Sequence, residues 1–202
     1  MSARDDILAS IRERKLRSAP KPSLYRAPAQ HDLVADFVHH AQFAHAEVHV
    51  LQNQADIPAA IADLLRSKNL PAVIHLPPDA PDLPWESAPG LSLERSAPGS
   101  DDATLATAPF GIAETGTLVY AARRDAPASW HFRAGFEIAI VRAEDIVPHM
   151  EIALARLKRE GNLPSTINFV TGPSRTGDIE QTLELGAHGP KNLAILVVRE
   201  GA

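Results

Sequence analysis

The succession of a strand, a helix and a second strand between residues 47 and 75 limits the fold of this chain most strongly. Glu47 to Leu51 alternates in polarity as a half-buried strand does. Asp56-Ile57-Pro58 begins a helix, because proline is well tolerated in the first helical turn, and residues 71–75 are typical of another strand. Strands joined by a helical crossover run parallel. The chain is therefore predicted to be an α/β protein with a parallel sheet.

The remaining sequence adds further helices and strands to this unit. Apolar residues recur with helical spacing from Leu33 to Ala46 and from Glu144 to Arg159. Apolar, β-rich runs typical of buried strands occupy residues 117–121, 136–141, 166–170 and 193–198. Some of these strands follow one another without a helix between them. We therefore expect a mainly parallel sheet with an antiparallel part.

Residues 77–100 have a different character and are predicted to form an extended connection. They hold six prolines, and only Gly90 to Leu93 has the composition of a strand. Trp85 lies in this connection. It either anchors the loop by burial, which is the commoner role, or lies over a ligand.

The first 26 residues are predicted to be a basic helix and linker, followed by the main domain at residues 27–202. Four apolar residues there have nearly helical spacing: Ile7, Leu8, Ile11 and Leu16. Residues 1–26 hold seven Lys and Arg against three acids, and the rest of the chain holds 13 against 22. The basic segment either docks on an acidic partner or forms a solvated helix. The acidic domain argues against nucleic-acid binding.

The amino-acid composition restricts the chemistry and the compartment. The chain has no cysteine, so it can supply no thiol nucleophile and no thiolate ligand for zinc or an iron–sulfur cluster. No apolar run approaches the roughly 18 residues that cross a bilayer, and the first residues lack the apolar core of a secretory signal. We therefore expect a cytoplasmic protein without a membrane span.

The stretch from Val170 to Pro190 is the strongest candidate for a binding site. It lies between two predicted strands and is rich in glycine, proline, hydroxyls and charge, and binding residues concentrate in loops of this kind. A strand that runs through Gly172 to Thr176 into a turn of helix would bring backbone N–H groups and Arg175 around an anion. Alternatively, Ser174 only caps that helix. The stretch lacks the Gly-Lys-Ser/Thr ending of a nucleotide phosphate loop.

Two further side chains are candidates for proton transfer. Glu114 precedes the buried strand 117–121, where it acts as a base or nucleophile or else holds the turn through hydrogen bonds. His188 lies in a glycine-rich loop before the last strand. The nine histidines show no helical ligand spacing with an acid, so no metal site is predicted.

Two segments resemble the signatures of the LUD-domain family. They are Gly111-Ile112-Ala113-Glu114-Thr115-Gly116-Thr117-Leu118 and residues 170–180 (VTGPSRTGDIE), the latter followed by Leu185-Gly186-Ala187-His188-Gly189-Pro190. The resemblance implies a Rossmann-like three-layer α/β sandwich of the sugar-phosphate isomerase and CoA-transferase superfamily, with an open cleft. It also implies a role in oxidising L-lactate to pyruvate with two partner proteins, at least one of which carries iron–sulfur clusters. No cofactor is then expected within this chain.

We therefore expect an accessory subunit of an L-lactate oxidation system that binds a small anionic ligand. The predicted site has the catalytic candidates Glu114 and His188 and the ligand-binding residues Thr115, Gly116, Thr171, Gly172, Ser174, Arg175, Thr176 and Asp178. One alternative is a free-standing enzyme that acts on a phosphorylated or CoA-linked small acid, as in the superfamily. Another is a non-catalytic adaptor that docks through its N-terminal helix.

Overall fold

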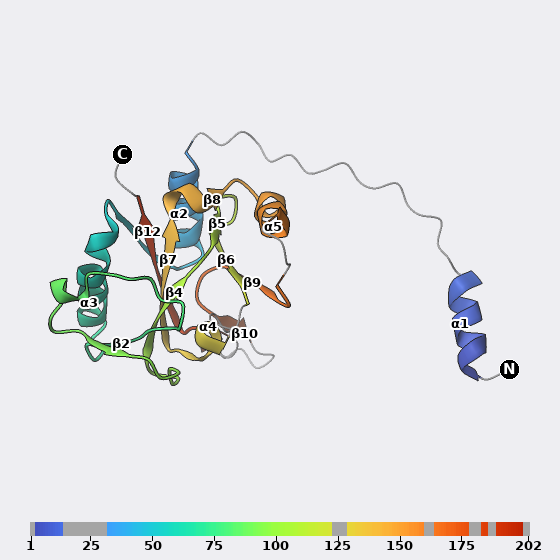
Figure 1. The fold of residues 1–202 in the computed structure, drawn as a ribbon, viewed down its shortest axis with the longest axis horizontal. Coiled ribbons are helices and arrows are strands. Elements are labelled where there is room, and N and C mark those ends of the chain that lie inside the picture. Colours follow the sequence, from blue (N-terminus) through green and yellow to red (C-terminus); the bar gives the residue numbers. More distant parts are fainter. Residues whose placement is uncertain are drawn as a thin grey trace.

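A computed structural model of the 202-residue chain describes residues 3–13, 32–122, 129–159, 164–177, 183–185 and 189–199. It contains a six-stranded sheet, a four-stranded sheet and flanking helices (Figure 1). The predicted α/β class with a mainly parallel sheet is confirmed. Residues 14–26, which include the predicted linker, lie outside the described residues.

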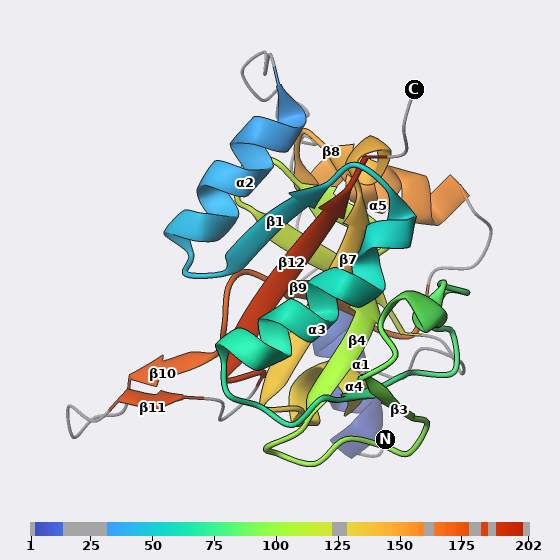
Figure 2. The same cartoon turned by 90° about the vertical axis from the view of Figure 1, so that its left-hand side faces the viewer.

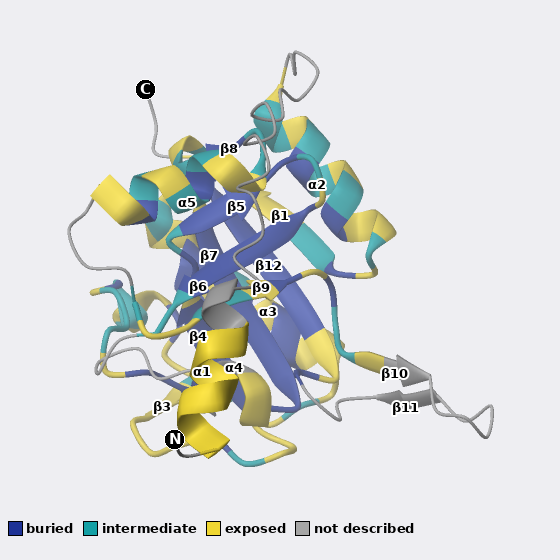
Figure 3. Cartoon of the chain, turned by 90° about the vertical axis from the view of Figure 1, so that its right-hand side faces the viewer, coloured by how far each residue is buried: buried dark blue, intermediate teal, exposed yellow. Residues whose placement is uncertain are grey.

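The central sheet consists of six parallel strands in the order β1-β12-β7-β4-β2-β3. Their bounds are Glu47–Leu51 (β1), Asn192–Val198 (β12), Phe136–Arg142 (β7), Ala103–Thr107 (β4), Val73–His75 (β2) and Ser92–Glu94 (β3). In register, Ile195 of β12 lies between Val48 of β1 and Ala139 of β7. The middle strands are buried on both faces (Figure 3), which is why they are almost continuously apolar.

Helix α3 (Ile57–Ser67) covers one face of this sheet (Figure 2). Its buried side chains Ile57, Ile61, Leu64 and Leu65 belong to a core that includes Leu105 and Ile138 of the sheet. Trp85, in the short 3-10 helix Trp85–Ser87, packs against the same core. Burial therefore anchors the proline-rich connection.

The opposite face is covered by α2 (Leu33–Phe43) and the four-stranded sheet in the order β8-β5-β6-β9. These strands are Ile146–Val147 (β8), Phe110–Ile112 (β5), Thr117–Ala121 (β6) and Ile167–Val170 (β9). Pairs β5–β6 and β6–β9 are antiparallel, and β5 and β6 follow each other without an intervening helix, as expected for the antiparallel part. Helix α5 (Met150–Arg159) packs on the outer side of this sheet through Ala153 and Leu157.

Three sequence expectations need correction. The helix predicted from Glu144 begins only at Met150, because Pro148 interrupts it after a 3-10 turn (Ala143–Asp145) and β8. Arg175–Gly177, where a helix capped by Ser174 would begin, is instead strand β10, paired antiparallel with β11 (Leu183–Leu185). Strands β4 and β5 lie in segments for which no strand was predicted.

Two short helices and a 3-10 turn complete the described elements. Helix α1 spans Ala3–Glu13, earlier than the predicted apolar run, and its residues 3–10 are exposed. Helix α4 spans Ser129–Arg133, and Gln54–Asp56 is a 3-10 turn before α3. Within the described residues, no helix has the length and apolar character needed to cross a membrane.

Candidate functional site

The first signature forms the hairpin between β5 and β6. The Glu114 N–H donates to the Pro148 carbonyl at 3.1 Å, and the Gly116 N–H donates to the Ile112 carbonyl at 2.9 Å. From α2, His40 donates through Nδ1 to the Ala113 carbonyl at 2.8 Å. These bonds fix the backbone on both sides of the Glu114 side chain, which is partly buried.

The second signature runs beside the first because β9 pairs with β6. Gly116 and Gly172 both have positive φ, +64° and +70°. A Cβ on Gly116 would lie 2.1 Å from the Ala41 nitrogen, and one on Gly172 would lie 1.9 Å from the Ala44 oxygen. Both glycines thus give the signatures contact with the C-terminal end of α2. Their role in this structure is close packing.

Threonine hydroxyls link the two signatures directly. Thr115 Oγ1 lies 2.7 Å from Thr117 Oγ1, which in turn lies 2.7 Å from Thr171 Oγ1. Thr117 is buried, whereas Thr115 and Thr171 are exposed. Each hydroxyl has one donor and two acceptor sites, so these two hydrogen bonds leave capacity on all three. The predicted ligand-binding residues Thr115 and Thr171 therefore link the two loops and keep capacity for a further hydrogen bond.

The structure also places the end of the Gly-Ala-His-Gly-Pro segment beside the second signature. The Ser174 N–H donates to the Pro190 carbonyl at 2.9 Å, and a Cβ on Gly189 would lie 3.1 Å from Ser174 Cβ. Thr176 lies on β10, where its backbone is opposite Glu184. Asp178 and His188 lie outside the described residues.

Arg175 lines a cavity of about 160 Å³, which we call the Arg175 cavity. Its other lining residues are His45, Glu47, Lys68, Phe136, Pro173, Lys191, Asn192 and Leu193. The cavity lies at the amino ends of β1, β7 and β12, since Glu47, Phe136 and Asn192 begin these strands. Glu114 is not among the lining residues. The structure thus separates the predicted anion-binding arginine from the predicted proton-transfer carboxylate.

Ion pairs shape the charge around the Arg175 cavity. Lys68 Nζ lies 2.7 Å from Glu47 Oε2, and Lys191 Nζ lies 3.2 Å from Asp101 Oδ1. Partial burial raises the pKa of Glu47, but hydrogen bonds from Lys68 and His49 outweigh this effect, so the pKa is lower than that of an ordinary carboxyl. Glu47 is therefore a carboxylate at neutral pH and balances one of the lining cations.

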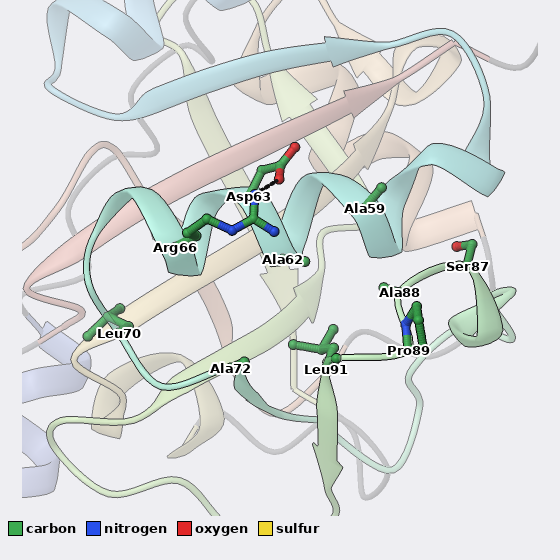
Figure 4. Close-up of a pocket in the computed structure, with 11 residues that line it drawn as sticks. Ala59, Ala62, Asp63, Arg66, Leu70, Ala72, Ser87, Ala88, Pro89 and Leu91 are labelled. Carbon is green, nitrogen blue, oxygen red and sulfur yellow. Dashed lines mark hydrogen bonds and ion pairs between the residues drawn. The ribbon is translucent and has the colours of Figure 1, made fainter.

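A larger cavity of about 380 Å³ lies between α3 and residues 87–91 (Figure 4). Alanine and leucine side chains dominate its wall, and Arg66 is paired with Asp63 at 2.7 Å. Both of these charged side chains are mostly exposed to solvent. Binding sites for small polar ligands need several polar groups that converge, and this cavity presents one exposed ion pair. It contains none of the predicted site residues.

A third cavity, of about 260 Å³, lies at the carboxyl ends of β7 and β12, where open α/β sheets usually bind ligands. It is lined by Arg142, Ala143, Glu144, Val198 and Arg199. Arg142 forms ion pairs with Glu144 and Asp145, so the cavity presents little uncompensated positive charge from this side chain.

A buried acid in the central sheet was not among the predicted site residues. Glu137 on β7 is fully buried, and Tyr120 of β6 donates to its Oε1 at 2.6 Å. Burial, together with the Glu137 carboxylate, raises the pKa of Tyr120 well above its usual value. A single acid inside the apolar run from Phe136 to Val141 is the signal that would have pointed to this pair. The pair links the two sheets.

Comparison with known proteins identifies the family. The sequence model of the LUD domain matches residues 95–198. The chain belongs to the LUD-domain family. The matched span contains both signatures, Arg175 and Lys191, whereas His45, Glu47 and Lys68 lie before it. Among the described residues, no three His, Asp or Glu side chains form a group that could hold a metal ion.

Several relatives carry the name Lactate utilization protein C. The protein from Geobacillus kaustophilus (strain HTA426) is 39% identical over 100 residues, which cover 48% of this chain and 42% of the relative. The protein from Bacillus licheniformis is 36% identical over 121 residues, which cover 57% and 50%. This LUD-domain chain thus spans about half the length of the curated relatives it matches.

A solved structure supports the fold. The crystal structure of a DUF162 family protein from Deinococcus radiodurans superposes with a TM-score of 0.59 at 25% sequence identity. The match covers 82% of this chain and 96% of that protein. The likeness therefore extends over most of the LUD-domain chain.

Proposed function

We propose that this chain is an accessory component of a system that oxidises L-lactate to pyruvate. The observation that carries the proposal is the LUD-domain match, together with 32–39% identity to proteins named Lactate utilization protein C. Since the matched segments cover only part of these relatives, the proposal concerns the shared domain first.

In this proposal, the chain binds the organic acid and partner proteins carry the electrons. Oxidation of lactate to pyruvate releases a pair of electrons and two protons, and an electron acceptor must take up the pair. The chain has no cysteine, so thiolate-ligated iron–sulfur clusters would belong to its partners. Arg175 is the residue we propose to hold a carboxylate, because guanidinium groups form paired hydrogen bonds with carboxylates. His188 is the proposed proton-transfer group, because Glu114 does not line the Arg175 cavity.

Genetic complementation tests the function. A strain that lacks this gene, and has no other lactate dehydrogenase, should fail to grow on L-lactate as sole carbon source and should recover with the wild-type gene. We expect Arg175→Ala to give no recovery. Arg66→Ala is the matched control, because Arg66 is an exposed arginine of the larger cavity, and it should restore growth.

The results separate the parts of the proposal. Undiminished growth of the deletion strain would exclude the lactate role. Recovery with a doubly substituted Arg175→Ala, Glu114→Gln protein would remove the proposed site but leave the pathway role. Detection of each variant at wild-type abundance excludes loss of the protein as the cause.

A further inference from the structure

We propose that the Arg175 cavity binds the carboxylate of a small 2-hydroxy or 2-oxo acid, and that Lys191 and His45 complete the recognition begun by Arg175. The choice of acid rests on the proposed function. The binding of an anion rests on the cavity itself, whose lining includes residues that neither the signatures nor the LUD-domain match contain.

Positive charge is concentrated around the Arg175 cavity. Residues 27–202 hold only 13 Lys and Arg against 22 acids, yet three of these cations line one small cavity together with a single acid, Glu47. They come from separate segments: Lys68 ends α3, Arg175 begins β10 and Lys191 precedes β12. The fold thus gathers positive charge in an acidic domain.

Acidic side chains compensate this positive charge only in part. Lys68 is neutralised by Glu47. The Asp101 partner of Lys191 has a side chain that is 88% exposed, and ion pairs in such settings are weak. In the part of the chain that the structure describes, no carboxylate lies within ion-pair distance of Arg175. An anion that enters the cavity would therefore meet two available cations.

His45 has an unusual backbone conformation. It follows the end of α2 with φ +69°, a left-handed conformation for which glycine is the most common residue. Asn69 has the same place after α3, with φ +54°, but it does not line the cavity. Disfavoured conformations of this kind cluster at functional sites. His45 thus occupies a position where glycine would have less backbone strain.

Size and polarity select the ligand. A volume of about 160 Å³ holds roughly five water molecules at about 30 Å³ each, which suits a three-carbon acid. Phe136 and Leu193 line the cavity but are almost fully buried, so the surface that a ligand meets is mainly polar. The preference for a 2-hydroxy or 2-oxo acid over inorganic phosphate therefore rests on the proposed function.

Calorimetric titration of the purified full chain with L-lactate, pyruvate and inorganic phosphate tests the site. We expect saturable binding of L-lactate or pyruvate, and weaker binding of phosphate. Arg175→Gln and Lys191→Gln should each weaken binding of the acid by about tenfold, since each removes a charge-assisted hydrogen bond. Arg66→Gln should leave binding unchanged, and thermal unfolding of every variant verifies that it is folded.

A pair of glycine substitutions isolates His45. His45→Gly and Asn69→Gly should both raise the unfolding temperature, because both relieve a left-handed backbone. Only His45→Gly should also weaken binding of the acid. A merely structural role of His45 would move the unfolding temperature alone.

Three results would overturn the inference: no saturable binding of either acid, binding that Arg175→Gln and Lys191→Gln do not alter, or phosphate as the only ligand. Binding without any lactate growth defect would contradict the proposed function and leave the site intact. A growth defect without binding would contradict the site and leave the function intact.

Discussion

Gly116 and Gly172 determine, at the scale of single residues, how closely the two signatures approach α2. Each combines a positive φ with a backbone atom of α2 where a side chain would have to lie. Glycines in such signatures invite an interpretation as phosphate-binding loops, as in nucleotide-binding proteins. Here the same residues serve helix-to-loop packing, and the charged lining of the Arg175 cavity includes neither of them.

Alanine at Gly116 or Gly172 should destabilise the fold by about 2 kcal/mol or more, because the new Cβ meets backbone that cannot move away and φ is strained. Gly90→Ala is the matched control, since a Cβ there has nothing within 4 Å, and it should be nearly neutral. Urea unfolding of the three variants measures the differences. Equal free energies of unfolding for all three would refute the packing role.

Tyr120 gives a prediction for alkaline pH. Its raised pKa means that the folded chain keeps the hydroxyl proton after the unfolded chain has lost it. The free energy of unfolding should therefore be insensitive to this group below about pH 10 and fall as the pH rises further. Tyr120→Phe should remove this fall and, at neutral pH, cost about 1–3 kcal/mol because buried Glu137 loses a donor.

Urea unfolding at about pH 8 and about pH 10.5, on either side of the usual tyrosine pKa, compares Tyr120→Phe with the wild type. A wild-type loss of stability across this range that the variant reproduces in full would show that other groups cause it.

At the scale of elements, α2 holds both signatures in place. His40, Ala41 and Ala44, all at its C-terminal end, contact the two signature loops, and His45 follows immediately. The N-terminal end of α2 is fixed by Asp32, whose Oδ1 accepts from the N–H groups of Val34 and Ala35 at 3.1 and 3.0 Å. The cap therefore stabilises the same helix that contacts both signatures.

Asp32→Ala should destabilise the protein by about 1 kcal/mol, since it removes an N-cap. Asp32→Asn should retain most of the stability, because asparagine caps nearly as well. Thermal unfolding of both variants makes the comparison. An equal loss in both variants would contradict capping by the side-chain oxygen and point to the negative charge instead, because both variants remove it.

At the scale of the whole molecule, periodicity predicted individual elements better than their partners. Residues 47–51 and 117–121 were located correctly, because apolar alternation and β-branched runs are local signals. Strand β4 was missed, since its alanines and threonines (Ala103 to Thr107) give no clear period. The β10–β11 pairing joins residues that lie six to ten positions apart, so the local sequence favoured a helix.

The site was predictable only in part for a similar reason. Arg175 stood out within a polar signature, and the contact of Ser174 with Pro190 followed the predicted grouping. His45, Lys68 and Lys191 carry no motif, and tertiary structure alone brings them to Arg175. The buried Glu137 was visible as one charge in an apolar strand.

Removal of residues 1–26 tests whether the N-terminal segment is a docking element. The deletion takes away seven basic and three acidic residues and changes the net charge from −5 to −9. Since residues 3–10 of α1 are exposed, we expect an unchanged unfolding temperature for the remaining domain. Retention of partner proteins in affinity purification by the truncated chain would exclude the adaptor function.

The strand order has a consequence for synthesis. The last strand, β12, lies between β1 and β7, so the first strand has no neighbour in the sheet until residues 192–198 have left the ribosome. Contacts between the two ends of a chain slow folding and leave apolar strands uncovered in the meantime. The nascent chain must therefore keep an open sheet until residue 198 has been synthesised, and a chain that stops within β12 would lack the strand that closes the sheet.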